Sequence, residues 1–347
     1  MIFRQLFDST SSTFTYLLAD ADSRQALLID PVFGQVSRDL ALLDELDLTL
    51  HLVVDTHAHA DHITAAWLLK QKTGCQIASS ATIGAQHVDI ALSDGQTFGV
   101  QGVTLTAMAT PGHTDGCMSF VTADRSKVFT GDTLLIRGCG RSDFQQGSAV
   151  TLYHSITQTL FALPDECVVL PAHDYQGRTV STIGEEKAFN ARVGADANET
   201  DFVEYMQAMR LPHPKLIDEA VPANLRSGCP EDGQLPQEPD WADIRLTYGG
   251  VPEIDLEWLE QHLDEVTVLD VRLPEEVRDA PAEGDLVDVH IPLDALRDRV
   301  NELPRDKPVV ALCRSGRRSA IAVSILKEAG FEKVASLSRG LREMMQL

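Results

Sequence analysis

The sequence predicts two α/β domains, the first with sheets covered by helices and the second with a small parallel sheet. The chain has 347 residues, which exceeds the usual size of a domain with a single hydrophobic core. Apolar runs of strand length alternate with helical patterns in both halves. Between the halves, residues 229–243 are rich in proline, glycine and acidic residues and lack apolar periodicity, as in a linker. We therefore expect domains at 1–235 and 249–347, joined by a linker at 236–248.

The first half contains apolar runs bounded by turn signals, which predict strands. These runs are TYLLA, QALLID, HLVVD, VTLTAMAT, KVFTGDTLLI and CVVLPAHD. A helix is expected over ITAAWLLKQKTG, where Gly74 supplies a stop. From residue 181 to about residue 221 the pattern becomes helical.

The second half alternates strand and helix patterns, which predicts parallel strands joined by helical crossovers. Strands are expected over VTVLDVR, PVVALCRSG and KVASLS. RSAIAVSILKEAG has apolar residues at helical spacing and predicts a helix.

Composition excludes several classes of partner. The net charge of −23 would repel nucleic acid and anionic lipid, so an anionic substrate would need local arginines. No apolar run approaches the roughly 20 residues that span a bilayer, and MIFRQLFDSTSSTF lacks the order of a secretory signal. The six cysteines form no CxxC pair, which argues against a disulfide scaffold or a cysteine-rich zinc site. We expect a cytoplasmic protein.

A dense group of metal-binding side chains follows the strand in HLVVDTHAHADHITAAW. It comprises His57, His59, Asp61 and His62. Three imidazoles and a carboxylate within six residues can converge on one or two cations. Three further candidates follow later strands: His113, Asp132 and His173.

This ordered set resembles the metallo-β-lactamase superfamily, with the HxHxDH signature at residues 57–62. The resemblance implies an αββα sandwich with the metal site at the edge between two sheets. It leaves the chemistry open. Most members hold two metals and hydrolyse esters or amides, whereas one branch holds a single ferrous iron and activates dioxygen.

Residues 137–147, RGCGRSDFQQG, are similar to the RGCGRxDFQxG stretch of the persulfide dioxygenases, the sulfur dioxygenase branch. Residues 173–193 and 220–228 also resemble that branch. The resemblance implies one Fe²⁺ per chain, bound by His57, His113 and Asp132, and oxidation of glutathione persulfide by O₂ to sulfite and glutathione. The resemblance also implies that four residues lie around the iron and orient the groups near it: His59, Asp61, His62 and His173. Spacing alone does not separate iron from zinc.

Several residues lie where this branch and its glyoxalase II relatives place glutathione contacts. They are Tyr175, Arg192 and Arg226, and Arg141 is a further candidate for substrate binding. Guanidinium groups pair well with the carboxylates of glutathione. Arg137, Arg141 and Asp143 are candidates for shaping the pocket, with a structural ion pair as the alternative.

A second reactive site is predicted where an apolar strand ends at Cys313 and a glycine-containing loop leads into a helix. Loop N–H groups, the helix N-terminus and the following arginines would stabilise a thiolate and bind an anionic sulfur compound. The predicted site comprises Cys313, Arg314, Ser315, Gly316, Arg317 and Arg318.

The loop resembles the CxxGxRS loop of rhodaneses, and Asp270 and Arg272 in LDVRLPEEV resemble another rhodanese signature. The similarity covers about residues 250–347 and implies sulfur transfer between thiosulfate and glutathione through a Cys313 persulfide. The usual GHIPGA segment is replaced by PAEGDLVDVHIPLDAL, in which HIPL is recognisable. Tyrosine phosphatases and arsenate reductases also use a cysteine loop with arginine, and remain a minor alternative.

Together these resemblances predict a bifunctional enzyme of sulfur metabolism. The main alternative is a binuclear zinc hydrolase of glutathione thioesters, resembling glyoxalase II, with a rhodanese-like binding module. A C-terminal domain that serves for sulfur binding or docking alone is a further alternative. The oligomeric state is not specified by the sequence, and a homodimer is compatible with it.

Overall fold

The computed structural model describes residues 1–209, 212, 216–236, 241–282, 284 and 286–342. Residues 237–240 of the predicted linker lie outside the described residues. The chain divides into two units. The first comprises Met1–Val36 and Leu46–Leu235, and the second comprises Ser37–Glu45 and Pro236–Leu347. We describe each unit by itself.

The first unit contains two six-stranded sheets. The first sheet has the order β1 (Ile2–Asp8), β2 (Thr13–Ala19), β3 (Gln25–Ile29), β4 (Thr49–Val54), β5 (Gln76–Ser80) and β6 (Ile90–Leu92). The second has the order β12 (Ser181–Thr182), β11 (Val168–Pro171), β10 (Lys127–Gly131), β9 (Met118–Thr122), β8 (Val103–Ala109) and β7 (Thr97–Val100).

A hydrophobic core between the two sheets joins them. Tyr16 and Leu52 of the first sheet belong to the same buried cluster as Phe120 and Phe129 of the second. The Tyr16 and Phe129 rings meet edge to face with centroids 5.0 Å apart, a favourable arrangement for buried aromatic pairs. The inward-facing apolar positions of both sheets therefore form one sandwich core.

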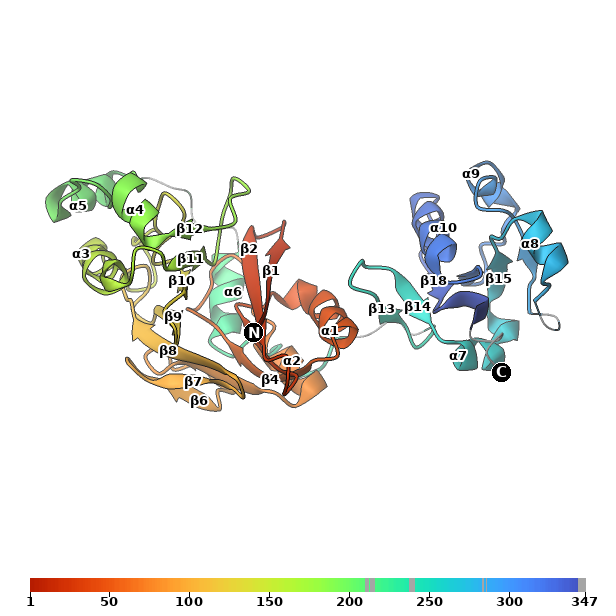
Figure 1. The fold of residues 1–347 in the computed structure, drawn as a ribbon, viewed down its shortest axis with the longest axis horizontal. Coiled ribbons are helices and arrows are strands. Elements are labelled where there is room, and N and C mark those ends of the chain that lie inside the picture. Colours follow the sequence, from red (N-terminus) through yellow and green to blue (C-terminus); the bar gives the residue numbers. More distant parts are fainter. Residues whose placement is uncertain (210–211, 213–215, 237–240, 283, 285, 343–347) are drawn as a thin grey trace. The chain divides into compact units, whose positions relative to one another are not determined.

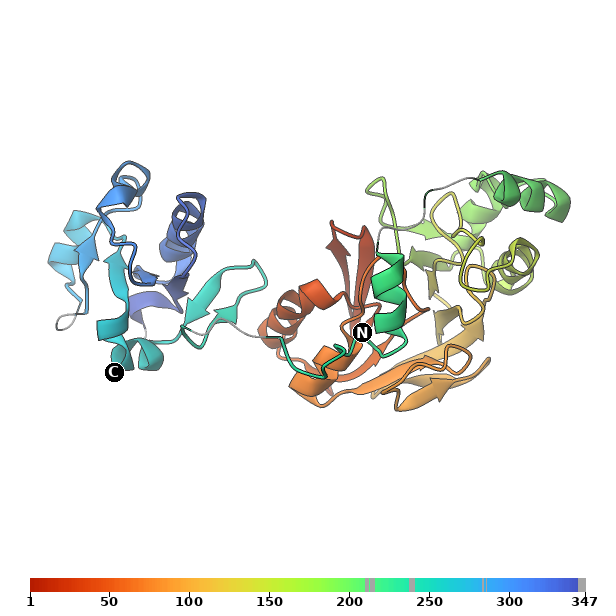
Figure 2. The same cartoon turned by 180° about the vertical axis from the view of Figure 1, so that it is seen from behind.

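Helices cover the outer faces of this sandwich (Figure 1). Helix α2 (Ala66–Thr73) packs on β4 and β5. Helix α1 (Val36–Glu45) connects β3 to β4 in the sequence. A second cluster joins the second sheet to α3 (Ala149–His154), α4 (Ile183–Phe189) and α5 (Glu199–Ala208). Helix α6 (Ile217–Asn224) is seen most clearly in Figure 2. The predicted αββα sandwich is confirmed.

The second unit contains a six-stranded sheet of order β13-β14-β18-β17-β15-β16. Its strands are β13 (Arg245–Leu246), β14 (Pro252–Ile254), β15 (Thr267–Asp270), β16 (Val289–His290), β17 (Val309–Leu312) and β18 (Val334–Leu337). All pairings are parallel except β13 with β14, and β13 falls within the stretch expected to be linker.

Apolar clusters cover both faces of this sheet, as a parallel sheet requires. The helices of the unit are α7 (Leu256–Gln261), α8 (Pro274–Asp279), α9 (Leu296–Arg299) and α10 (Arg317–Glu328). The predicted small parallel α/β domain is confirmed. Within the described residues of the whole chain, no helix is long and apolar enough to cross a membrane.

Candidate metal centre and cysteine site

The HxHxDH loop connects the end of β4 to α2 and is held by two distant segments. The carboxylate of Asp30, which follows β3, accepts hydrogen bonds from the Thr56 N–H at 2.7 Å and the Thr56 hydroxyl at 2.9 Å. Asn224, the last residue of α6, donates to the carbonyls of His59 and His62 and accepts from the Thr64 N–H, each at 2.8 Å. Hydrogen bonds from the residue after β3 and from the end of α6 therefore hold the backbone of this loop.

Three of the predicted ligands form one group. The ligand atoms of His57, His113 and Asp132 lie within 4.8 Å of one another. They follow β4, β8 and β10, so strand ends from both sheets supply them. The Nε2 atom of His113 lies 3.7 Å from a carboxylate oxygen of Asp132.

The hydrogen bonds of the two histidines leave Nε2 as the ligand atom in each. Nδ1 of His57 lies 3.0 Å from the Thr56 hydroxyl, and Nδ1 of His113 donates to the Arg141 carbonyl at 2.6 Å. Burial lowers the pKa of both imidazoles. Burial raises the pKa of Asp132, but the charge of His173 and its hydrogen bond lower it more, to well below the ordinary value. Neutral imidazoles beside a carboxylate are ready to bind a cation.

Two glycines make room for this group. Gly131 has φ +52°, and a Cβ there would lie 2.8 Å from the Thr56 hydroxyl oxygen. A Cβ on Gly140 would lie 2.3 Å from the Asp132 carbonyl oxygen and 2.9 Å from Nδ1 of His113. The strand predicted through residue 136 therefore ends at Gly131, because the chain turns there to present Asp132.

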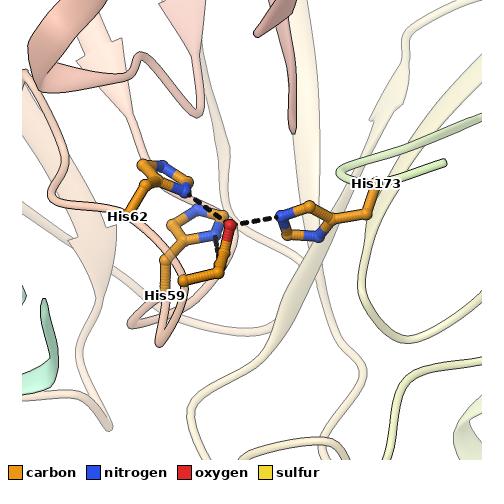
Figure 3. A group of neighbouring side chains, drawn as sticks. His59, His62 and His173 are labelled. Carbon is orange, nitrogen blue, oxygen red and sulfur yellow. Dashed lines mark hydrogen bonds and ion pairs between the residues drawn. The ribbon is translucent and has the colours of Figure 1, made fainter. Parts of the chain in front are cut away.

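The remaining predicted ligands form a second group beside the first. It comprises His59, Asp61, His62 and His173. Figure 3 shows His62 and His173 pointing toward the same carboxylate, with Nδ1 of His62 at 3.0 Å and Nε2 of His173 at 2.9 Å from Asp61. Nδ1 of His59 and Nε2 of His62 are buried without a hydrogen-bond partner among the described residues.

His173 connects the two groups. Its Nδ1 donates to Asp132 at 2.6 Å, while its Nε2 faces Asp61. Burial lowers the pKa of His173, but the two carboxylates raise it more, to well above the ordinary value. The two carboxylates thus favour the protonated form of His173, and its contact with Asp132 can orient that carboxylate.

A cavity of about 340 Å³ opens on the first group. Three of the four predicted substrate-binding residues line it: Arg141, Tyr175 and Arg192. Arg226 lines a different hollow, where its Nε donates to the Cys229 carbonyl at 3.3 Å and a terminal nitrogen lies 3.7 Å from Glu231. Arg226 is therefore not among the substrate contacts of this cavity, because its side chain contacts Cys229 and Glu231 instead.

Most arginines of the cavity are held by acidic side chains. Arg137 is bonded to Glu185 and Glu186, and Arg141 makes a two-pronged pair with Asp143 at 2.6 and 2.7 Å. These pairs fit the structural alternative considered for them. Arg178 pairs with Asp174 at 2.9 Å.

Arg192 differs from these arginines. It donates to the Cys139 carbonyl at 2.6 Å and lies over the Tyr205 ring at 5.6 Å. Within the described part of the chain, it makes no ion pair with a carboxylate. Arg192 therefore keeps a positive charge available to a substrate.

The predicted cysteine site forms at the end of β17. Cys313 follows the strand, Gly316 takes φ +85°, and α10 begins at Arg317. The sulfur lies 3.6 Å from the Ser319 hydroxyl. Burial raises the pKa of the thiol, but the Ser319 hydroxyl and loop N–H groups, including that of Ser315, lower it more, so it lies below the ordinary value. The structure thus places a thiol with a lowered pKa at a helix N-terminus.

The arginines of this loop are not equivalent. Both terminal nitrogens of Arg318 donate to Glu276 of α8, at 2.5 and 2.7 Å, whereas Arg314 and Arg317 are exposed. The buried pair of Asp270 and Arg272 closes the end of β15.

β16 ends at His290, the first residue of HIPL, and Nε2 of His290 lies 2.9 Å from the Arg272 carbonyl. Residues 283 and 285 of the altered segment lie outside the described residues.

Comparison with known proteins identifies the family of the first domain. Residues 9–173 match the metallo-β-lactamase superfamily model. Over 229 residues the chain is 51% identical to the mitochondrial persulfide dioxygenase ETHE1 of Homo sapiens, covering 66% of this chain and 89% of that protein. The chain belongs to the persulfide dioxygenase family.

Solved structures support this placement in the persulfide dioxygenase family. The ETHE1 structure from Myxococcus xanthus is 52% identical, covers 66% of this chain and 100% of its own, and superposes with a TM-score of 0.64. A metallo-β-lactamase structure from Staphylococcus aureus covers 97% of this chain and 98% of its own, with a TM-score of 0.61. Its 22% identity shows a shared fold alone.

This member of the persulfide dioxygenase family also carries a second recognisable domain. Residues 255–346 match the rhodanese-like domain model. The two resemblances inferred from the sequence are therefore confirmed, and both connect the chain to sulfur metabolism.

Sequence reasoning named the candidate ligands, which the structure brings together, but missed the residues that hold them. Asp30, Thr56 and Asn224 carry no metal-binding signature. The sequence predicted a strand or a family resemblance for their segments but not the contacts that these residues make. The segments are QALLID, the start of the histidine loop and AVPANLRSG.

Proposed function

We propose that the N-terminal domain binds one Fe²⁺ per chain through His57, His113 and Asp132 and oxidises glutathione persulfide with O₂ to sulfite and glutathione. The observation that carries this proposal is the group of two neutral imidazoles and one carboxylate at the cavity. Such a set occupies one face of the metal and is typical of non-haem iron oxygenases. When bound, iron would supply the place where oxygen and the substrate sulfur meet.

The protein's own residues would prepare this site. His173 holds the Asp132 carboxylate, while the Thr56 hydroxyl and the Arg141 carbonyl hold the two imidazoles. All three ligands are largely enclosed, which limits competing water. We infer that Arg192 binds a glutathione carboxylate, because its charge is not neutralised by a described acidic side chain and a guanidinium can make paired hydrogen bonds.

Metal analysis together with oxygen uptake tests the proposal. The purified chain, loaded anaerobically with Fe²⁺, is expected to hold one iron and to consume O₂ when glutathione persulfide is added. Two zinc ions per chain and no oxygen uptake would instead support the binuclear zinc hydrolase of glutathione thioesters. That alternative has one specific observation in its favour, since the second group also offers four ligands.

For the C-terminal domain we propose sulfur transfer between thiosulfate and glutathione. The Cys313 thiolate would attack the outer sulfur of thiosulfate, forming a new S–S bond while the bond to the sulfite sulfur breaks and sulfite leaves with the electron pair. A glutathione thiolate would then take the terminal sulfur, giving glutathione persulfide and restoring the Cys313 thiolate. The reaction can run in either direction, and glutathione persulfide is the compound that both domains share.

Cys313→Ser tests the sulfur-transfer proposal. Transfer from thiosulfate to glutathione should fall to background, because a serine hydroxyl does not form a persulfide. Unchanged transfer would show that the domain serves for binding or docking.

A further inference from the structure

Two buried serines lie beneath the reactive cysteine. Ser319, in the first turn of α10, and Ser336, in β18, are both fully buried. Their hydroxyl oxygens are 2.8 Å apart, and the Ser319 oxygen is 3.6 Å from the Cys313 sulfur. Cys313 just after β17, Ser319 in α10 and Ser336 in β18 therefore form a continuous line of hydrogen-bonding groups, here called the hydroxyl chain.

The number of available protons indicates which hydroxyl donates to which along the hydroxyl chain. The Ser319 hydroxyl has one proton and, besides the Ser336 oxygen, faces two acceptors when Cys313 is a thiolate: the sulfur and the Gly316 carbonyl, which is 3.0 Å away. Ser336 can donate to Ser319 at 2.8 Å, whereas its own contact with the Leu337 carbonyl is long at 3.4 Å. Donation from Ser336 polarises the Ser319 hydroxyl and strengthens its bond to the sulfur.

We propose that Ser336 is a positioning residue for sulfur transfer, because its hydroxyl donates to Ser319 and so directs the Ser319 proton at the Cys313 thiolate. The inference rests on the proposed function of the C-terminal domain and deepens it. Ser336 touches neither donor nor acceptor and acts through Ser319.

The hydroxyl chain interacts differently with the thiolate and the persulfide states of Cys313. In the persulfide, the negative charge moves to the terminal sulfur, about 2 Å further along the S–S bond. Ser319 can then return its proton to the Gly316 carbonyl. The Ser336–Ser319 pair therefore stabilises the thiolate more than the persulfide, and favours release of the carried sulfur.

Charged and titratable groups approach the loop from several elements and are left unchanged by a substitution at Ser336. They are Arg314, Arg317, Arg318 with Glu276, Asp270 with Arg272, His290, and Arg339, which follows β18 beside Gly316. A difference in pH dependence between Ser336 variants thus reports the hydroxyl chain.

The test is the pH profile of Cys313 alkylation in the full chain. Iodoacetamide labelling is followed by mass spectrometry of the peptide that contains Cys313. Ser336→Ala should raise the apparent pKa by about 0.5–1 unit, which slows labelling about 3–10-fold below that pKa. Ser336→Thr keeps the hydroxyl and should restore the wild-type profile.

Ser338→Ala is the matched control, since Ser338 lies just beyond the same strand and bonds to Glu253. Its profile should overlay the wild type. The proposal is overturned if Ser336→Ala also overlays the wild type while Ser319→Ala shifts, or if Ser336→Thr shifts as far as Ser336→Ala. Labelling needs no sulfur donor, so a wild-type chain that fails to transfer sulfur would refute the proposed function separately.

Discussion

At the scale of single residues, the partner of each histidine decides what that histidine does. His57 and His113 have Nδ1 bonded to a hydroxyl and a carbonyl, which leaves Nε2 for a metal. His173 has a carboxylate at each nitrogen, and these carboxylates raise its pKa. One residue type thus supplies both ligands and the group that orients a ligand.

Arg192 offers a direct test of substrate recognition. Arg192→Ala should raise KM for glutathione persulfide about 10–100-fold, because a charge-assisted bond to the substrate carboxylate is lost. Steady-state oxygen uptake measures this, with iron content as the control for the metal site. Arg192→Lys keeps the charge without the planar fork and should give an intermediate KM. An unchanged KM in both variants would remove Arg192 from the binding site.

Glu276 offers a test of donor choice in the rhodanese-like domain. Glu276→Gln removes the carboxylate that neutralises Arg318, so KM for the thiosulfate dianion should fall by roughly fivefold. The exposed pair of Arg297 and Glu328 provides the control, and Glu328→Gln should leave KM unchanged. A rise in KM for Glu276→Gln would mean that Glu276 serves to orient Arg318 for binding.

At the scale of elements, the reactive residues follow the ends of strands. β4, β8, β10 and β11 each end shortly before a member of the metal groups, and β17 ends at Leu312, directly before Cys313. Strand ends give these side chains rigid starting points, which loops alone would not provide. Asn224 adds a further constraint, since the end of α6 holds the histidine loop.

Asn224 is therefore expected to matter for stability and for metal binding. Asn224→Ala would leave two buried carbonyls and one N–H without their partner and should lower the free energy of unfolding by about 2–4 kcal/mol. Urea unfolding measures the loss, and titration with Co²⁺ measures metal affinity. Asn198→Ala, which removes an exposed cap of α5, should cost about 1 kcal/mol and leave Co²⁺ binding intact. Equal effects would contradict the special role of Asn224.

At the scale of the whole molecule, each unit contains a complete set of reactive residues. The metal groups and their cavity come from the first unit, and the cysteine loop comes from the second. Each site is therefore expected to function without residues from the other.

Reciprocal substitutions test this independence. Asp132→Ala should abolish iron binding and oxygen uptake while sulfur transfer stays within about twofold of wild type, since no residue of the first unit belongs to the cysteine loop. Cys313→Ser should do the reverse. Loss of both activities in either variant, with the chain still folded by circular dichroism, would contradict independent sites.

Much of the site was predictable because its ligands lie close together in sequence or carry a distinctive spacing. Residues 57–62 show this for the metal centre, and Cys313 with its glycine and arginines shows it for the second site. Arg226 shows the limit: its residue type suited a glutathione carboxylate, but its segment packs beside a different hollow. The residue type shows what a side chain can bind, but it does not show where in the fold that side chain points.

The sequence by itself determined the two α/β domains, the metal-binding residues and the reactive cysteine, because hydrophobic periodicity and closely spaced ligands are local properties. Tertiary structure decided which ligands form the first group, which cavity arginine keeps its charge, and which buried residues hold the sites. Asn224 meets the histidine loop across about 160 residues, and Ser336 meets Ser319 across 17. Such contacts depend on how sheets and helices pack, and no local pattern records them.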